Sequence, residues 1–147
     1  MSRPDVFARN LERYAKRTGA SLEQTARAVT IELFNGVVMA TPVGNPDLWG
    51  SPAPPGYVGG RARGNWQVSV GAPVTQETSR IDSQGSAVES EIVSTVVSGE
   101  VNYLSNNLPY IGRLEYEGWS TQAPAGMVRK NMQRVRKIVA EEARKAF

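Results

Sequence analysis

The chain has 147 residues, 40% hydrophobic and 21% charged, which fits one globular domain spanning residues 1–147. It contains no cysteine and no histidine, so disulfides, thiolate chemistry and the commonest metal ligand and general base are excluded. The net charge is +3, but residues 123–147 hold seven Lys or Arg and two Glu (7 − 2 = +5), which leaves +3 − 5 = −2 elsewhere and predicts a face that meets something negative.

The first predicted element is a helix near the N-terminus. Asp5 can cap it, and it runs to about Arg17, where Gly19 provides a C-terminal cap. Its apolar positions recur at helical spacing, which predicts one buried stripe made of Phe7, Leu11, Tyr14 and Ala15.

A second helix follows directly. Ser21 with Gln24 three residues later matches a capping box, in which each side chain accepts from the other residue's backbone N–H. The helix should end near Ala40, because Pro42 restricts the residue before it. Spacings of three and four predict that one face is buried, made of Leu22, Ala26, Val29, Leu33 and Val37.

Residues 43–61 form a long loop rich in proline and glycine, through which no helix or regular strand can persist. Trp49 and Tyr57 lie in it, and aromatic side chains in a loop need a surface to pack on. The loop either folds back on its own domain or forms an arm that contacts an adjacent subunit. We favour the arm, because interface cores are enriched in aromatic residues.

The middle of the chain predicts a small antiparallel sheet and one more helix. Residues 65–70 alternate apolar and polar side chains, as a half-buried strand does, with Trp66 more typical of a core than of a ligand platform. Residues 87–97 fit a helix capped by Ser86, although β-branched residues crowd its second half. Residues 101–105 read as a second short strand.

The last third predicts a turn and two helices. Residues 106–109 form the turn, and a short helix over 110–117 is stopped by Gly118. Pro124 suits the first turn of a long final helix with an apolar face of Val128, Met132, Val135 and Val139. The expected fold is therefore α+β, with two N-terminal helices, a small antiparallel sheet, a long proline-rich loop and a long C-terminal helix.

Three short blocks resemble the minor tail proteins of the tail-completion and neck group of long-tailed bacteriophages. The first is Thr41-Pro42-Val43 followed by residues 60–66, the second is residues 106–110 with 114–118, and the third is residues 122–129. The blocks stand in the family's order from about residue 20 onward. This chain departs from the common pattern through the insertion 44–59, where many members pass almost directly from the valine to the glycine-arginine pair.

The resemblance implies a structural virion protein that forms a ring, expected to be hexameric, in the head-to-tail neck. Its partners would be further copies of itself, the head-closure or connector proteins and the tail tube or tail terminator, and genomic DNA would pass through without sequence-specific contact. Synthesis in the host cytoplasm and no membrane contact are expected, because no apolar run approaches about 18 residues. The second block's scaffold would be Asn107, Pro109, Tyr110, Glu115 and Gly118.

Two arginines of the first block, Arg61 and Arg63, are candidates for contact with an adjacent subunit or the tail tube, together with Trp49 and Tyr57 of the loop. They fit a phosphate, or an ion pair with Glu115 or Glu117. The ion pair is favoured, because most such pairs are architectural. The two glutamates are two residues apart on a helix and point to different faces, which argues against a shared catalytic or metal site.

The final helix carries a candidate electropositive surface of Arg129, Arg134, Arg136 and Lys137. These cations could line a DNA channel, pair with a neighbour's carboxylates, or form a solvated helix face, which is what charge runs usually are. The alternative functions are a tail-terminator ring and a small non-specific DNA-binding protein. We expect neither an enzyme nor a cofactor, because no convergent acidic cluster or activated nucleophile is evident.

Overall fold

The computed structural model describes residues 3–43, 59–116 and 126–145. Within them the chain forms, in order, α1 (Arg3–Thr18), α2 (Leu22–Ala40), α3 (Arg61–Gly64), β1 (Gln67–Val70), α4 (Ser86–Thr95), β2 (Asn102–Ser105), α5 (Ile111–Tyr116) and α6 (Val128–Arg144). The fold is α+β, as the sequence predicts.

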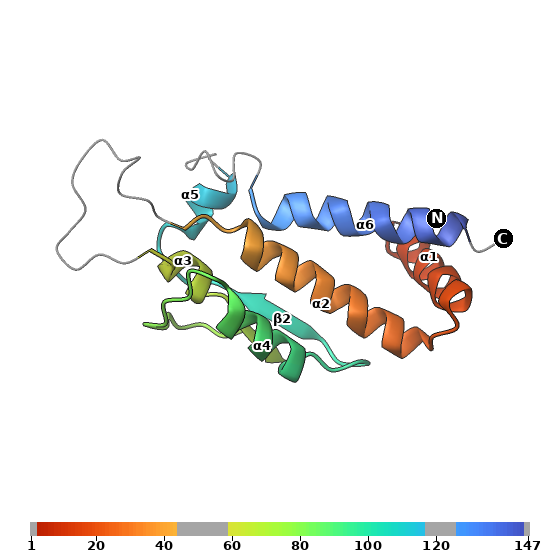
Figure 1. Ribbon diagram of the computed structural model, residues 1–147, viewed down its shortest axis with the longest axis horizontal. Coiled ribbons are helices and arrows are strands. Elements are labelled where there is room, and N and C mark those ends of the chain that lie inside the picture. Colours follow the sequence, from red (N-terminus) through yellow and green to blue (C-terminus); the bar gives the residue numbers. More distant parts are fainter. Residues whose placement is uncertain (1–2, 44–58, 117–125, 146–147) are drawn as a thin grey trace.

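Helix α2 is the central element (Figure 1). Helix α6 and the end of α1 lie along one side of α2, whereas α4 and the two-stranded sheet lie on the other side. The short helices α3 and α5 gather at the end of the molecule where α2 finishes and α6 begins. Helix α2 therefore separates two sides of the molecule. One side consists of α1 and α6, and the other consists of α4 and the sheet.

Helix α1 shows the expected stripe but a different start. Ala15 is buried and the other three stripe residues are half-buried. The helix already includes Arg3, so Asp5 lies inside the first turn and the prediction that it caps the helix is wrong. The physical reason is Pro4, which the first turn of a helix tolerates because its missing N–H has no partner there.

The predicted capping box of α2 is confirmed. Gln24 N donates to Ser21 Oγ at 3.1 Å, and Ser21 N donates to Gln24 Oε1 at 3.0 Å. The helix ends at Ala40, as expected ahead of Pro42. Leu22 is exposed, against the prediction, and Thr25 is the first buried residue of the helix.

The two strands pair antiparallel, with Val68 opposite Leu104 and Val70 opposite Asn102. Strand β1 starts two residues later than predicted, because Arg61–Gly64 forms the short helix α3, which the sequence analysis did not predict. Asn65 closes that helix and is fully buried, with its side-chain amide donating to Arg61 O at 2.8 Å.

The predicted third long helix is confirmed as α4, but Ser86 does not cap it. Gly85 takes the capping position with a left-handed φ of 77°. Asp82 supplies the missing acceptor, since Val88 N donates to Asp82 Oδ2 at 2.9 Å. The helix stops at Thr95, so the last β-branched residues of the predicted range leave helical geometry.

Helix α6 buries a face that differs at one position from the prediction. Val135 and Val139 are buried, but Met132 is 39% exposed and Asn131 is buried instead. Asn131 faces Gly36 of α2, where an added Cβ would collide with the Asn131 amide. The close approach of α2 and α6 therefore selects a residue one position earlier on the helix. Pro124 lies outside the described residues.

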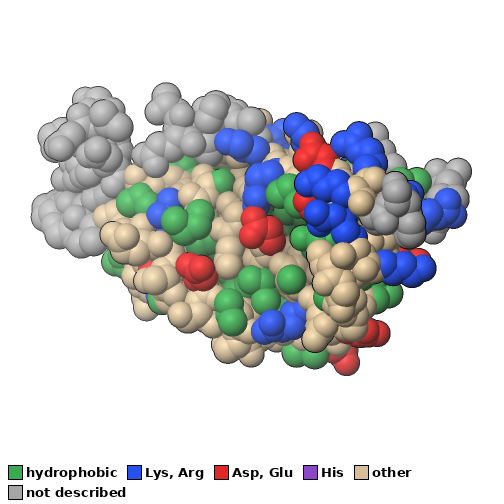
Figure 2. Space-filling view, turned by 45° about the vertical axis from the view of Figure 1, so that its right-hand side comes forward, with side chains coloured by type: hydrophobic (Ala, Val, Ile, Leu, Met, Phe, Trp, Pro, Cys, Tyr) green, Lys and Arg blue, Asp and Glu red, His purple; other side chains and the backbone are tan. Residues whose placement is uncertain are grey.

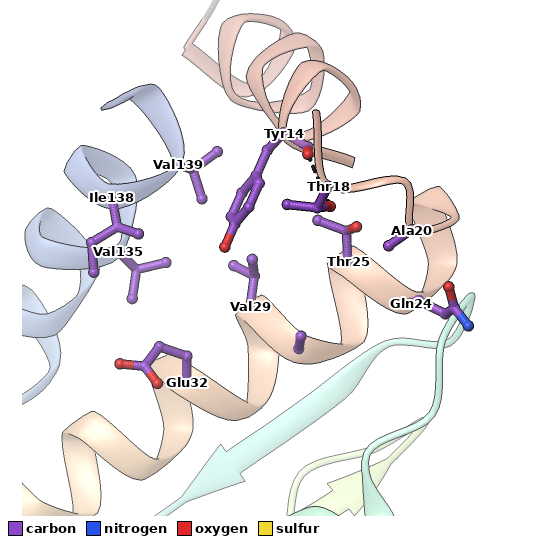
Figure 3. Close-up of a pocket in the computed structure, with 11 residues that line it drawn as sticks. Tyr14, Thr18, Ala20, Gln24, Thr25, Val29, Glu32, Val135, Ile138 and Val139 are labelled. Atoms are coloured by element: carbon purple, nitrogen blue, oxygen red, sulfur yellow. Dashed lines mark hydrogen bonds between the residues drawn. The ribbon is translucent and has the colours of Figure 1, made fainter. Parts of the chain in front are cut away.

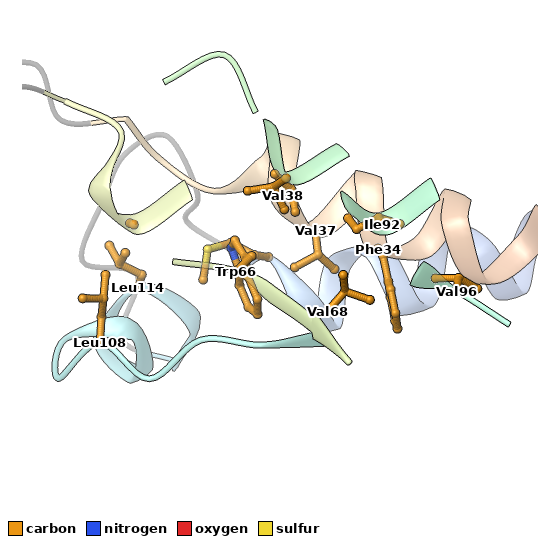
Figure 4. Close-up of a cluster of buried hydrophobic side chains, with 12 residues drawn as sticks. Phe34, Val37, Val38, Trp66, Val68, Ile92, Val96, Leu108 and Leu114 are labelled. Carbon is orange, nitrogen blue, oxygen red and sulfur yellow. The ribbon is translucent and has the colours of Figure 1, made fainter. Parts of the chain in front are cut away.

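The core lies between α2, α4 and the sheet and extends to α5 (Figure 4). Trp66 is 5% exposed, which confirms its predicted core position. Its indole Nε1 donates to Thr41 Oγ1 at 2.7 Å, and Thr41 Oγ1 donates to Val37 O at 2.8 Å. A buried indole N–H needs such a partner.

Candidate functional site

The first two sequence blocks meet in space around Trp66. Besides the bond from Trp66 to Thr41, Asn106 Nδ2 donates to Ala62 O at 2.9 Å. Asn107 Nδ2 donates to Val74 O at 2.8 Å and so holds the loop after β1. We call this cluster the motif hub and define it by Thr41, Arg63, Trp66, Asn106, Asn107 and Glu115.

Arg63 joins three segments of the motif hub through backbone carbonyls. Its guanidinium donates to Thr41 O at 2.9 Å, to Met39 O at 3.1 Å and to Ser83 O at 2.7 Å. Burial lowers the pKa of Arg63 from its ordinary value, and the negative charge of Asp82 opposes that shift. The predicted ion pair of Arg63 with Glu115 is therefore wrong, because the C-terminal carbonyls of α2 take its donors.

Arg61 has a different role from Arg63. It is exposed and forms an ion pair with Glu77 at 3.2 Å, so the favoured ion pair is confirmed for Arg61, with Glu77 as the partner in place of Glu115. Both side chains are largely in solvent, where such a pair contributes little to stability. Of the second block's other scaffold residues, Pro109 is exposed and Tyr110 packs partly buried against the core.

Glu115 of α5 caps α6 from a distance in sequence. Its Oε1 accepts from Met127 N at 2.7 Å and from Val128 N at 2.8 Å, and its Oε2 accepts from Arg129 N at 3.1 Å. These are N–H groups that a helix start leaves without intrahelical partners. Burial alone would raise the pKa of Glu115, but the hydrogen bonds from Val128, Met127 and Arg129 outweigh it, and the pKa is lowered.

Two of the four predicted electropositive residues bind carboxylates of their own chain. Arg129 Nε donates to Glu115 Oε2 at 2.9 Å, and its guanidinium lies 4.9 Å from the centre of the Tyr116 ring. Arg134 donates to Glu32 of α2 at 2.7 Å and to Asn131 at 3.0 Å. These two arginines attach the final helix to α5 and α2, so they are structural.

The other two predicted residues belong to a stripe that points away from the molecule. Within the described ranges, no hydrogen bond or ion pair engages these exposed side chains, which we name the basic stripe: Lys130, Arg136, Lys137 and Arg144. The stripe extends from Lys130 to Arg144, which is 14 helical steps or about 21 Å at 1.5 Å per residue. Figure 2 shows Lys and Arg gathered along this side of the molecule.

Charge is segregated between the two sides of α2. Residues 3–18 carry five cations and two anions (+3), and residues 128–144 carry six and two (+4), so α1 and α6 together carry +7. Residues 22–43 and 59–116 carry five cations and eight anions, which is −3. The chain's modest net charge therefore conceals two sides of opposite sign.

A groove of about 750 Å³ opens between α1, α2 and α6 (Figure 3). Tyr14 reaches into it from α1, and Val29 faces it from α2. Its walls are mainly apolar and are made by Tyr14, Thr18, Ala20, Gln24, Thr25, Ala28, Val29, Glu32, Val135, Ile138 and Val139. The sequence pattern does not predict this groove, because the groove exists only once three distant helices pack.

Several predicted residues lie outside the described ranges, namely Trp49, Tyr57, Glu117 and Gly118. Among the residues that are described, no group of three or more carboxylates could hold a metal ion. No described helix is both long and apolar enough to cross a bilayer.

Comparison with protein-family models, curated proteins and solved structures finds no match for this chain.

Proposed function

We propose that this chain is a structural subunit of a ring in the neck of a tailed bacteriophage, where it completes the tail and joins it to the head connector. The observation that carries the proposal is the charge segregation, +7 on α1 and α6 against −3 on residues 22–43 and 59–116. A subunit with oppositely charged sides favours head-to-tail contact between copies, and a head-to-tail contact that closes makes a ring.

The motif hub supports the family resemblance on which the proposal also rests. Blocks separated by tens of residues converge on Trp66 and Glu115 through hydrogen bonds. Short sequence blocks that resembled the family only by chance would not be expected to contact one another in the folded chain. In this reading the hub holds the subunit's shape, and recognition takes place on its outer surfaces.

The basic stripe supplies the surface that faces genomic DNA in the proposed ring. Lys130, Lys137 and Arg144 recur at steps of seven and extend about 21 Å along one helix face, with Arg136 to one side of it. These cations can meet phosphates without reading bases. Such contacts are weakened by salt and independent of sequence, as a channel for a whole genome requires. Arg129 and Arg134 stay bound to Glu115 and Glu32 and do not contribute to this surface.

The proposal is tested on phage particles that encode this chain. Mass spectrometry of purified virions should find the protein, and labelling in electron micrographs should place it between head and tail. Deletion of its gene should leave filled heads and finished tails that do not join. Virions that lack the protein and still assemble would refute the proposal.

The basic stripe also favours a second candidate, a non-specific DNA-binding protein of the host or phage. The two functions differ in where the chain is found. A DNA-binding protein would be absent from finished virions and would bind duplex DNA as an isolated monomer. A tail-terminator ring, the nearest structural alternative, would instead be found on free tails before they meet heads.

A further inference from the structure

An exposed apolar surface lies where the end of α4 meets the β1–β2 pair. Four valines there have exposed fractions of 39, 46, 47 and 61%, and we name them the valine patch: Val70, Val93, Val97 and Val101. Asn102 joins its members, because its side chain bonds both Val97 N and Val97 O (3.0 and 2.9 Å) and it pairs with Val70 in the sheet. Contiguous exposed apolar side chains mark a protein contact surface.

Carboxylates surround the valine patch. Glu89 lies one helical turn before Val93, and Glu100 precedes Val101. Ser98 Oγ donates to Glu23 O at 2.8 Å, which brings a third carboxylate to the same end. No described residue pairs with these three glutamates, and the nearby Arg27 instead donates to Val93 O and Val96 O. The patch is therefore apolar at its centre, and three carboxylates against the one guanidinium of Arg27 give its margin a net charge of −2.

The groove between α1, α2 and α6 has the opposite character. Its walls are mainly apolar, and two of its three helices, α1 and α6, together carry +7. Its wall carboxylate Glu32 is paired with Arg134, and Arg17 and Lys145 both bind Glu142 at the α1–α6 contact. These groups place three cations against two carboxylates beside the groove. A ligand with apolar side chains and flanking carboxylates would match this groove.

We propose that the valine patch of one copy docks in the α1–α2–α6 groove of the next copy. The inference rests on the proposed ring and names the two surfaces that build it. The chain's own sheet end has the required chemistry, with branched apolar side chains for the groove and Glu89 and Glu100 for its cationic margin. A contact between the grooves of two copies would instead bring together the α1 and α6 helices of both, each pair with a net charge of +7, and charge repulsion disfavours this arrangement.

The absence of cysteine allows a direct test by disulfide trapping, since introduced thiols are the only ones present. The double variant Val97→Cys/Ile138→Cys is oxidised with diamide, both as purified chain and in virions, and analysed on non-reducing gels. It should give a ladder of linked multimers. A mixture of the two single variants should give dimers only, because one linked junction uses both thiols.

The matched control replaces the groove thiol by one on the same helix, in Val97→Cys/Met132→Cys. Met132 is exposed on α6 but does not line the groove, so this variant should give at least tenfold less multimer. Circular dichroism of each variant should match the unmodified chain.

Equal multimer yield from the control would overturn the inference, as would dimers of Val97→Cys alone or no ladder in either sample. The proposed function would survive such a result if the protein is found in the neck of virions. Conversely, a ladder from a protein that virions lack would support the docking of copies and refute the neck function.

Discussion

The strongest stability prediction concerns Glu115, the carboxylate that caps α6 from α5. Its side chain is 7% exposed and accepts three backbone N–H groups at the start of α6. Replacing it by alanine leaves those donors without an acceptor and removes a negative charge from the positive end of the helix dipole. The final helix should then lose its attachment to the motif hub.

The size of the effect follows from these contacts. An N-terminal cap contributes about 1 kcal/mol, and a charge at a partly buried helix start contributes up to about 2 kcal/mol. Glu115→Ala should therefore lower the free energy of unfolding by about 3 kcal/mol, or the Tm by about 6–12 °C in a chain of this size. The ion pair with Arg129 adds little, because the Arg129 side chain is 49% exposed.

Glu115→Gln separates the charge from the hydrogen bonds. It keeps one carbonyl acceptor and loses the negative charge, so the expected loss is about 1–2 kcal/mol. Because the folded-state pKa of Glu115 is lowered, its contribution is complete above the ordinary pKa and disappears as the pH falls through the lowered value. The free energy of unfolding of Glu115→Gln should therefore fall less between pH 7 and about pH 3 than that of the unmodified chain.

Urea unfolding followed by circular dichroism measures both effects. Glu12→Gln is the matched control, since Glu12 is exposed in the middle of α1, away from both helix ends, and should change the free energy of unfolding by less than about 0.5 kcal/mol. Two results would refute the capping role of Glu115. One is a Glu115→Ala chain as stable as this control, and the other is a Glu115→Gln chain whose free energy of unfolding depends on pH as that of the unmodified chain does.

Three further predictions test other contacts. Gly126→Ala should cost about 1–3 kcal/mol in urea unfolding, because φ is 84° there and an added Cβ would lie 2.6 Å from Glu115 O. Gly112→Ala, in open space on α5, should instead stabilise the chain by about 0.5 kcal/mol. Equal effects of the two substitutions would contradict this prediction. Thr41→Val should cost about 1–3 kcal/mol by leaving the Trp66 N–H without an acceptor, while Thr41→Ser should recover most of that stability; a Thr41→Val chain with an unchanged Tm would refute the role of the bond. Arg136→Gln should reduce the salt slope of duplex binding by about 1 at unchanged Tm, and Arg134→Gln should instead lower the Tm; the reverse pattern would show that the basic stripe is wrongly assigned.

Most of the secondary structure could be predicted from the sequence because its causes are local. The capping box of α2 involves residues three apart, and the apolar stripe of α1 depends on spacings of three and four. The alternation of apolar and polar residues in β1, which predicts that Val68 is buried, is likewise a local pattern. The predictions failed where a neighbouring element intervened, as for Asn131 and Met132, whose burial is decided by the approach of α6 to Gly36.

The candidate surfaces depended on tertiary structure for a related reason. The cations of the C-terminal segment are equivalent in the sequence, and only folding shows that Arg134 meets Glu32, 102 residues away, while Arg136 points outward. Glu115 likewise becomes a cap only because α5 delivers it to a helix that starts 13 residues later. Amino-acid order by itself determined the α+β class, the helices and the buried tryptophan, since these depend on neighbours along the chain. The free and paired charges, the groove and the separation of charge into two sides were decided by packing, because each depends on residues that only the fold brings together.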